Sequence, residues 1–295
     1  LTMVHIPTKS LLKRQGLAPQ KKLGQNFLVH ERTPRRIVDL SGLHPEDEVI
    51  EVGVGLGALT KPLAAACAKV IGLEADSGII RMHEEQGDLP ANVELIHADV
   101  LKVDFASLVQ PGKRLKIVTN LPYSISSPFL FRLIDHAPLI DFAVVMLQKE
   151  VAQRLCAQPG TKEYGVPTVL LAACARVEPL LSVHPAEFHP QPKVDSQVIK
   201  ITFNPVPAAV QALGEFDRAL FTRVVHAAFG QRRKTLLNGL ASGCLAEKDQ
   251  LTQAIEAIGL NPTVRAETLH PAQFVALTRS LRPLSAPQPE TPGPV

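Results

Sequence analysis

Short runs rich in β-branched residues recur through the first two-thirds of this 295-residue chain, and helix-length amphipathic stretches separate them. This alternation is typical of a parallel sheet covered by helices, because consecutive parallel strands need a crossover long enough to hold a helix. We therefore predict a doubly wound α/β domain. Its expected strands are 48–52, 69–74, 93–97, 116–120, 142–147 and 197–203, and its expected helices are 58–67, 77–86, 127–136, 149–157 and 166–176.

The connection before the last expected strand is rich in proline and spans only residues 188–194. It is too short for a crossover helix, so we expect the final strand to pair antiparallel. Beyond residue 204 the pattern becomes purely helical, with segments near 215–229, 232–241, 249–258 and 271–280. The predicted organisation is a partly flexible basic arm (1–20), the α/β domain (21–204), a small helical domain (205–282) and a proline-rich disordered tail (283–295).

Composition excludes several classes of protein. Hydrophobic residues make up 45% of the chain, enough for a full core. No run approaches the roughly 18 apolar residues of a membrane-spanning helix. The first residues lack a basic flank followed by an apolar run, so the cytoplasm is the expected compartment. The cysteines show no metal-ligand spacing and are expected to be reduced core thiols, with no metal bound: Cys67, Cys156, Cys174 and Cys244.

The small net charge of +3 conceals two opposed regions. Residues 9–36 carry eight lysines and arginines against one glutamate, whereas residues 37–110 carry four against thirteen acidic residues. A basic arm beside an acidic block suggests an anionic partner at one face. A solvated tail would give the same local pattern.

Three glycines at alternate positions follow the first expected strand, in Val49-Ile-Glu-Val-Gly-Val-Gly-Leu-Gly57. Such a turn into a helix lets the backbone approach a ligand and presents free N–H groups to it. Glu74 ends the next strand, where a carboxylate can bind both ribose hydroxyls. Asp99 follows the third strand, from where it can accept a hydrogen bond from an adenine amine. Together they indicate an adenosine cofactor.

The fourth strand leads into Asn120-Leu-Pro-Tyr123 at the edge of the sheet where ligands bind in such folds. An adenine amine is a poor nucleophile because its lone pair is delocalised into the ring. Acceptors for its N–H groups, the Asn120 side chain and the Leu121 carbonyl, would localise that lone pair toward an electrophile. Pro122 stiffens the loop and Tyr123 can stack on the base. A sulfonium electrophile would require no general base.

The chain resembles the ribosomal RNA adenine N6,N6-dimethyltransferases, most closely the bacterial branch that acts on the small subunit. The resemblance runs from about residue 21 to residue 281. The motifs that carry it are Lys22-Leu-Gly-Gln-Asn-Phe-Leu28, Glu51-Val-Gly-Val-Gly-Leu-Gly57, Asn120-Leu-Pro-Tyr123, Phe188-His-Pro-Gln-Pro-Lys-Val-Asp-Ser196, Phe229-Gly-Gln-Arg-Arg-Lys-Thr-Leu236 and Arg265-Ala-Glu267.

This resemblance implies a class I, Rossmann-like S-adenosylmethionine-dependent methyltransferase fold with a helical C-terminal domain. It also implies dimethylation of adenosine N6 in small-subunit ribosomal RNA during ribosome biogenesis, by a monomer with no membrane partner. The cofactor contacts it implies are Gln25, Asn26, Leu28, Gly53, Gly55, Glu74, Asp99 and Asn120. The target adenine would meet Asn120, Leu121, Pro122, Tyr123 and Phe188, with the base held between the rings of Tyr123 and Phe188.

Basic residues in both domains are candidate contacts for RNA phosphates. The strongest candidates are Lys21, Lys22, Arg223, Arg232, Arg233 and Lys234.

Three alternatives remain at this stage. A nicotinamide dehydrogenase would share the glycine turn and Glu74 but would give no role to the Asn120 loop. A non-catalytic RNA-binding assembly factor would keep the fold without turnover. Within the family, the alternative hardest to exclude is a related methyltransferase that acts on large-subunit ribosomal RNA. The basic segment 229–236 favours the small subunit as the substrate.

Overall fold

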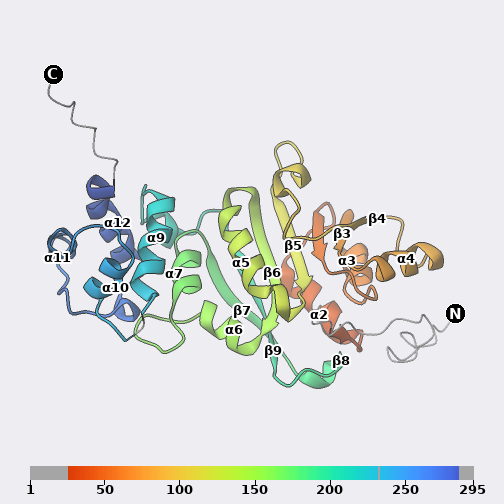
Figure 1. Cartoon of the computed structure of the whole chain (residues 1–295). Coiled ribbons are helices and arrows are strands. Elements are labelled where there is room, and N and C mark those ends of the chain that lie inside the picture. Colours follow the sequence, from red (N-terminus) through yellow and green to blue (C-terminus); the bar gives the residue numbers. More distant parts are fainter. Residues whose placement is uncertain (1–25, 232, 286–295) are drawn as a thin grey trace. The chain divides into compact units, whose positions relative to one another are not determined.

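The structure is a computed structural model that describes residues 26–231 and 233–285 (Figure 1). Its contacts divide the chain into two compact units. The sheet unit comprises the described residues up to Cys156 together with Cys174–Pro207. The helical unit comprises Ala157–Ala173 together with the described residues from Ala208 onward. The predicted arm (1–20) and residues 286–295 of the predicted tail lie outside the described residues.

The sheet unit is built on a seven-stranded sheet with the order β4-β3-β2-β5-β6-β9-β7. The first five strands in this order pair in parallel, and β9 is antiparallel to both of its neighbours. All six strands predicted from the sequence are confirmed, with each end within two residues. Their bounds are β2 Glu48–Val52, β3 Lys69–Glu74, β4 Val93–His97, β5 Leu115–Asn120, β6 Ile140–Gln148 and β9 Ser196–Thr202.

The prediction was wrong about residues 173–183, where it extended a helix to 176 and included no strand. Helix α7 ends at Ala172, and a seventh strand, β7 (Arg176–Val183), follows. β7 lies at the edge of the sheet, so few of its side chains are buried and it lacks a clear alternation of apolar residues. Pro179 stands at a register shift, which an edge strand tolerates. The proline-rich connection therefore joins two neighbouring strands, and the predicted antiparallel pairing is confirmed.

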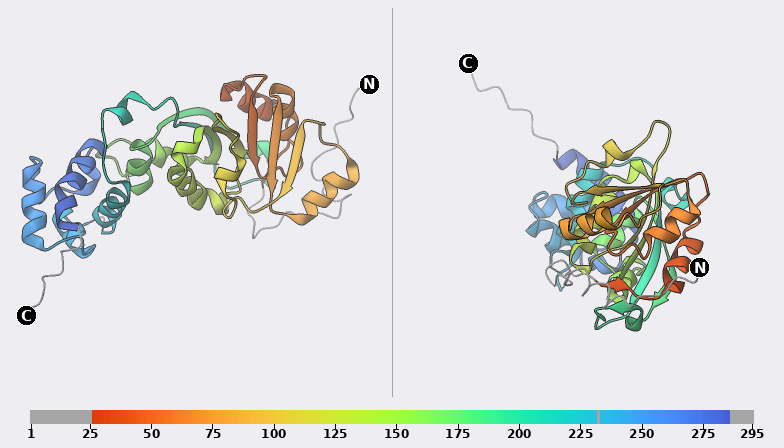
Figure 2. Two further views of the ribbon diagram at one scale, coloured as in Figure 1. Left: turned by 90° about the horizontal axis from the view of Figure 1, so that it is seen from above. Right: turned by 90° about the vertical axis from the view of Figure 1, so that its right-hand side faces the viewer.

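Both faces of the sheet are covered by helices, as predicted for a doubly wound domain (Figure 2). On β6, Val144 and Met146 pack in one core with Ile37 and Leu63, which belong to two helices of the same face. The alternate residue Val145 points to the opposite face and is equally buried. The helices of this unit are α2 Arg32–Ser41, α3 Thr60–Ala66, α4 Ser77–Gln86, α5 Ser126–Asp135 and α6 Lys149–Leu155.

Four short 3₁₀ turns and a small second sheet complete the sheet unit. The turns are η2 Phe105–Leu108, η3 Tyr123–Ile125, η4 Ala137–Leu139 and η5 Pro185–Glu187. In the second sheet, β1 (Phe27–Leu28) pairs antiparallel with β8 (Phe188–His189), so that Leu28 lies opposite Phe188. Neither this pair nor α2 is predicted from the sequence, because a strand of two residues carries no periodicity and α2 presents many charged side chains.

The helical unit contains α7 Val166–Ala172, α8 Ala208–Gln211, α9 Arg218–Phe229, α10 Leu236–Ser242, α11 Lys248–Ala257 and α12 Pro271–Ser285, with the turn η6 Ala266–Thr268. Its core stacks the ring of Phe229 on that of Phe274 at 5.8 Å. The buried Tyr164 donates a hydrogen bond of 2.9 Å to the Leu269 carbonyl.

Three boundary or burial predictions need correction. Residues 157–173 group with the helical unit rather than with the sheet, because α7 packs on α9. Helix α12 continues to Ser285, three residues into the predicted tail. Cys67 and Cys174 are buried as expected, but Cys156 is half-buried and Cys244 is exposed, so the latter is not a core thiol. Cys244 follows the end of α10, where the chain turns with a φ of 51°.

Candidate active site

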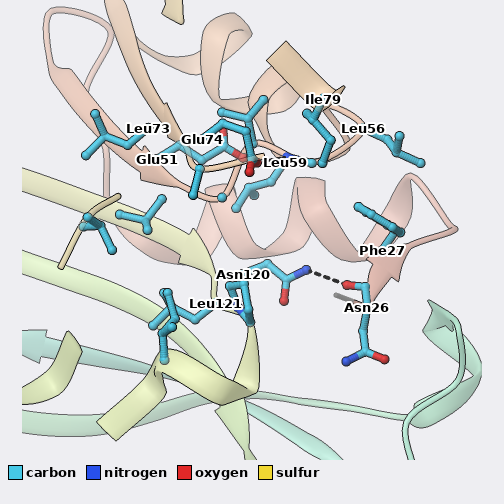
Figure 3. Close-up of a pocket in the computed structure, with 18 of the residues that line it drawn as sticks. Asn26, Phe27, Glu51, Leu56, Leu59, Leu73, Glu74, Ile79, Asn120 and Leu121 are labelled. Carbon is cyan, nitrogen blue, oxygen red and sulfur yellow. Dashed lines mark hydrogen bonds between the residues drawn. The ribbon is translucent and has the colours of Figure 1, made fainter. Parts of the chain in front are cut away.

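A pocket opens at the carboxyl ends of β2, β3, β4 and β5 (Figure 3). Parallel pairing brings these ends to one edge of the sheet, and the loops that follow them supply most of the lining. Seven of the eight predicted cofactor contacts line this one pocket, and Gln25 lies outside the described residues. The seven are Asn26, Leu28, Gly53, Gly55, Glu74, Asp99 and Asn120.

The glycine turn forms one wall of the pocket and has the backbone that its sequence predicts. Gly53 and Gly55 adopt φ values of 76° and 55°, in the left-handed region that side chains disfavour. A Cβ atom on Gly55 would also lie 3.2 Å from the ring of Phe27. Glycine is thus needed at residue 55 both for the backbone and for the close approach of Phe27.

Glu74 is buried at the end of β3, and each of its carboxylate oxygens accepts one backbone hydrogen bond. Oε2 accepts from the Gly55 N–H at 3.0 Å, and Oε1 accepts from the Asp76 N–H at 2.8 Å. A carboxylate offers about four lone-pair sites, so each oxygen keeps one further acceptor position. Two acceptor positions on one fixed carboxylate suit the two neighbouring hydroxyls of a ribose.

Asp99 occupies the loop after β4 and is more open to solvent than Glu74. Its Oδ1 accepts the Leu101 N–H at 2.9 Å, which fixes the side chain, and Lys102 Nζ is 3.9 Å from Oδ2. The carboxylate is 42% exposed and lines the pocket. It can therefore accept a hydrogen bond from a ligand amine.

Glu51, to which the sequence analysis assigned no role, is the most deeply buried carboxyl group of the pocket. Its Oε2 has no hydrogen-bond partner among the residues that the structure describes. Burial, and to a lesser extent the charge of Glu74, raises the pKa of Glu51 to about 8. A buried carboxyl oxygen without a partner is costly, and a cation placed against it would relieve the cost. S-adenosylmethionine carries both an ammonium and a sulfonium group, so the residues present fit this cofactor.

The position of Glu51 could have signalled this role. It stands on β2 two residues before Gly53 and faces the pocket from the strand itself. An acidic residue within an otherwise apolar, buried strand is unusual enough to suggest a ligand.

Asn120 ends β5 at the opposite wall of the pocket (Figure 3). Its amide nitrogen Nδ2 donates to the Asn26 carbonyl at 3.3 Å, which leaves Oδ1 as the acceptor atom of this side chain. The preceding Thr119 donates a buried hydrogen bond of 2.6 Å to the Val52 carbonyl. The ends of β2 and β5 are thus tied together behind the loop, and Leu121 and Pro122 line the pocket beside Asn120.

The two predicted aromatic contacts lie outside the residues that line this pocket. Tyr123 is half-buried and its hydroxyl lies 2.6 Å from Ser196 Oγ. Burial raises the pKa of Tyr123, which keeps the hydroxyl neutral, although the Ser196 hydrogen bond opposes that shift. Phe188 is only 4% exposed and packs in the hydrophobic core with Leu28. The structure does not bring Phe188 to the pocket, and a base sandwich would require its ring to move out of the core.

Of the predicted RNA contacts, Arg223, Arg233 and Lys234 are exposed on the helical unit. Arg223 lies on α9, whereas Arg233 and Lys234 precede α10, whose first helical residue is Leu236. The predicted start of that helix at 232 was therefore four residues early. Lys21, Lys22 and Arg232 lie outside the described residues.

Comparisons with known proteins agree on one family. The family model described as ribosomal RNA adenine dimethylase matches residues 17–282. The ribosomal RNA small subunit methyltransferase A of Desulfotalea psychrophila is 49% identical over 281 residues, covering 92% of this chain and 94% of that protein. The protein of the same name from Syntrophus aciditrophicus is 41% identical, covering 92% of this chain and 98% of that protein.

Two solved structures resemble the chain over most of its length. A dimethyladenosine transferase from Plasmodium falciparum matches with a TM-score of 0.69 and 25% identity, covering 87% of this chain and 98% of that one. The 23S rRNA methyltransferase ErmE matches with a TM-score of 0.62 and 25% identity, covering 87% of this chain and 100% of that one.

Replacing Glu74 with Ala is expected to weaken S-adenosylmethionine binding by about 1.5 to 3 kcal/mol, the range for hydrogen bonds to a charged group. Glu74→Gln should fall between Ala and the wild type, because it keeps one acceptor oxygen. Isothermal titration of the cofactor measures both. Unchanged affinity in Glu74→Ala would reject the ribose-binding role.

Replacing Glu51 with Gln is expected to change how stability depends on pH. The ordinary pKa of this carboxyl is 4.5 and that in the fold is about 8, so its contribution to the stability of the ligand-free protein is complete below about pH 4.5. That contribution is lost as pH rises through about 8. The melting temperature of the wild type should therefore fall relative to that of Glu51→Gln between pH 5 and about 8.5. Parallel curves for the two proteins would contradict the burial argument.

Proposed function

The chain belongs to the ribosomal RNA adenine dimethylase family, and from that premise we propose that it transfers methyl groups from S-adenosylmethionine to the N6 nitrogen of adenosine in small-subunit ribosomal RNA, as a step in ribosome biogenesis. The observation that carries the proposal is the gathering of Glu74, Asp99 and Asn120 around one pocket at the sheet edge. Acceptors for a ribose, for an adenine amine and for a target amine thus stand together.

The cofactor supplies an electrophilic methyl group on its sulfonium. Glu74 would hold the ribose hydroxyls, Asp99 would accept from the adenine amine, and Glu51 would face the positive charge. The glycine turn would lie against the cofactor, because Gly53 and Gly55 carry no side chains. These roles leave the Asn120 loop for the amine that receives the methyl group.

The Asn120 loop activates the target amine by accepting its hydrogen bonds. Asn120 Oδ1 and the Leu121 carbonyl would accept from the two N–H groups, which would favour a pyramidal nitrogen whose lone pair is localised and can attack an electrophile. Pro122 limits the movement of the loop, and Tyr123 and Phe188 are the aromatic residues proposed to hold the base. The methylated product is acidic enough to lose its proton to water, so no general base is needed.

Sequence identity favours the small subunit over the large subunit as the substrate. The relatives named for the small subunit are 49% and 41% identical to this chain, whereas the large-subunit enzyme ErmE is 25% identical. Mass spectrometry of ribosomal adenosines from cells with and without this protein tests the proposal. The expected result is that cells without the protein lack dimethyladenosine in the small-subunit RNA. Loss from the large-subunit RNA instead would show that the large subunit is the substrate.

We further propose that the protein acts as a monomer in the cytoplasm, where its RNA substrate is found. In the part of the chain that the structure describes, no helix is long and apolar enough to cross a membrane. The exposed cations of the helical unit, together with Lys21, Lys22 and Arg232, are proposed to contact RNA phosphates.

Replacing Asn120 with Ala is expected to lower the rate of methyl transfer by about 10² to 10³, the typical effect of losing one preorganised hydrogen-bonding group. The fold should survive, because Asn120 is only partly buried and stands at the very end of β5. Single-turnover methylation of reconstituted small subunits measures the rate. Asn238→Ala, at an exposed asparagine of α10, is the matched control. A rate within a few-fold of the wild type would remove Asn120 from the catalytic assignment.

Replacing Arg233 and Lys234 together with Ala is expected to weaken binding to the subunit and to flatten the plot of log affinity against log salt by up to about 2 units. Cofactor affinity should not change, because the pocket is formed by the sheet unit alone. Lys248→Ala, at an exposed lysine of α11, controls for loss of charge elsewhere on the helical unit. A wild-type salt slope in the double variant would contradict the RNA-contact role.

A further inference from the structure

His83 lies buried beneath the glycine turn without lining the cofactor pocket. It belongs to α4, and its side chain is 1% exposed. Its Nε2 is 2.8 Å from the Gly55 carbonyl oxygen, and its Nδ1 is 2.8 Å from Asp88 Oδ1. The other Asp88 oxygen accepts from Lys61 Nζ at 2.8 Å. A chain of polar contacts thus runs from the surface of the protein to the glycine turn.

These contacts fix the direction of the hydrogen bond to the turn. A carbonyl oxygen can only accept, so His83 Nε2 carries a hydrogen and donates a hydrogen bond to the Gly55 carbonyl. Burial alone would raise the pKa of Asp88, but its hydrogen bonds with Lys61 and His83 lower it further than burial raises it. The Asp88 carboxylate lies 2.8 Å from Nδ1, and this contact orients the imidazole ring so that Nε2 points at the turn.

Gly55 is consequently anchored on both sides of its Cα atom. The N–H that precedes the Cα donates to Glu74 Oε2, and the carbonyl that follows it accepts from His83 Nε2. These are the two peptide groups whose orientations define the φ of 55° at Gly55. A glycine has little intrinsic preference for one backbone conformation, so such anchors decide which one the turn adopts.

We propose that His83 is a positioning residue for the cofactor site. Its hydrogen bond to the Gly55 carbonyl fixes the backbone of the glycine turn. The Gly55 N–H in turn fixes the Glu74 carboxylate that receives the ribose. This inference rests on the proposed function and deepens it, because the mechanism above gives His83 no role. The Asp88–Lys61 pair supports the imidazole from the far side. Cofactor affinity therefore depends in part on three residues that do not line the pocket, namely Lys61, His83 and Asp88.

Three substitutions at residue 83 separate this role from simple core packing. His83→Gln can place an amide N–H near the position of Nε2 and keep the bond to Gly55. His83→Asn can replace only the Nδ1 contact with Asp88, and His83→Leu fills the space with no donor. We expect His83→Asn and His83→Leu to raise the Kd for S-adenosylmethionine about 5- to 20-fold. The Kd of His83→Gln should stay within about 3-fold of the wild type.

Two readouts on each protein make the test decisive. Isothermal titration gives the Kd for S-adenosylmethionine, and hydrogen exchange of ligand-free protein reports on residues 53–57. Exchange there should accelerate in His83→Asn and His83→Leu but not in His83→Gln. If His83 only fills volume, His83→Leu should bind best and Gln and Asn should be alike, and that order would overturn the proposal.

A milder variant covers the case in which a residue 83 substitution unfolds the protein. Asp88→Ala keeps the imidazole but removes its orienting carboxylate at a partly exposed position, and should raise the Kd about 2- to 5-fold. Asp39→Ala, at an exposed aspartate of α2, is the control. An unchanged Kd in Asp88→Ala would count against the proposal. A wild-type protein that binds no S-adenosylmethionine would instead reject the proposed function, so the two failures are distinguishable.

Discussion

The parallel pairing of β2 with both β3 and β5 is the constraint on which the candidate site depends. Parallel strands end at the same edge, so the glycine turn, Glu74 and Asn120 meet although they are far apart in the sequence. The register is set by apolar residues such as Val49, which is fully buried between its neighbours. A slip of one residue would exchange the two faces of a strand and turn Glu51 away from the pocket.

Within this frame, the polar groups of the pocket are satisfied mostly by backbone atoms. Glu74 accepts two backbone N–H groups, and Thr119 and Asn120 each donate to a carbonyl. Such bonds fix the acceptors before any ligand arrives, which lowers the ordering cost of binding. Glu51 is the exception among the described residues of the pocket, because its Oε2 has no hydrogen-bond partner in the part of the chain that the structure describes. This oxygen is where we expect a ligand to supply the missing partner.

Sequence patterns predicted the parts of the fold that local periodicity determines. The strands β2, β3, β5 and β6 are largely buried and followed from their apolar runs. The spacing of Glu74 from the glycine turn predicted that both contact one ligand, and both line the same pocket. β7 was missed because an edge strand buries little and carries no clear alternation. His83 could not be assigned because its partners, Gly55 and Asp88, lie on separate loops. Phe188 was placed at the target base from its motif, but motifs do not show which way a ring points.

The small sheet formed by β1 and β8 joins the wall of the pocket to the segment that is proposed to meet the target base. Leu28 lines the cofactor pocket, and opposite it Phe188 begins the segment assigned to the target base. Thr33 also donates to the Glu187 carboxylate at 2.7 Å, which adds a second tie beside the β1–β8 pair. A redesign of the segment around Phe188 for a different nucleotide therefore has to preserve its pairing with β1, or it disturbs Leu28 at the cofactor pocket.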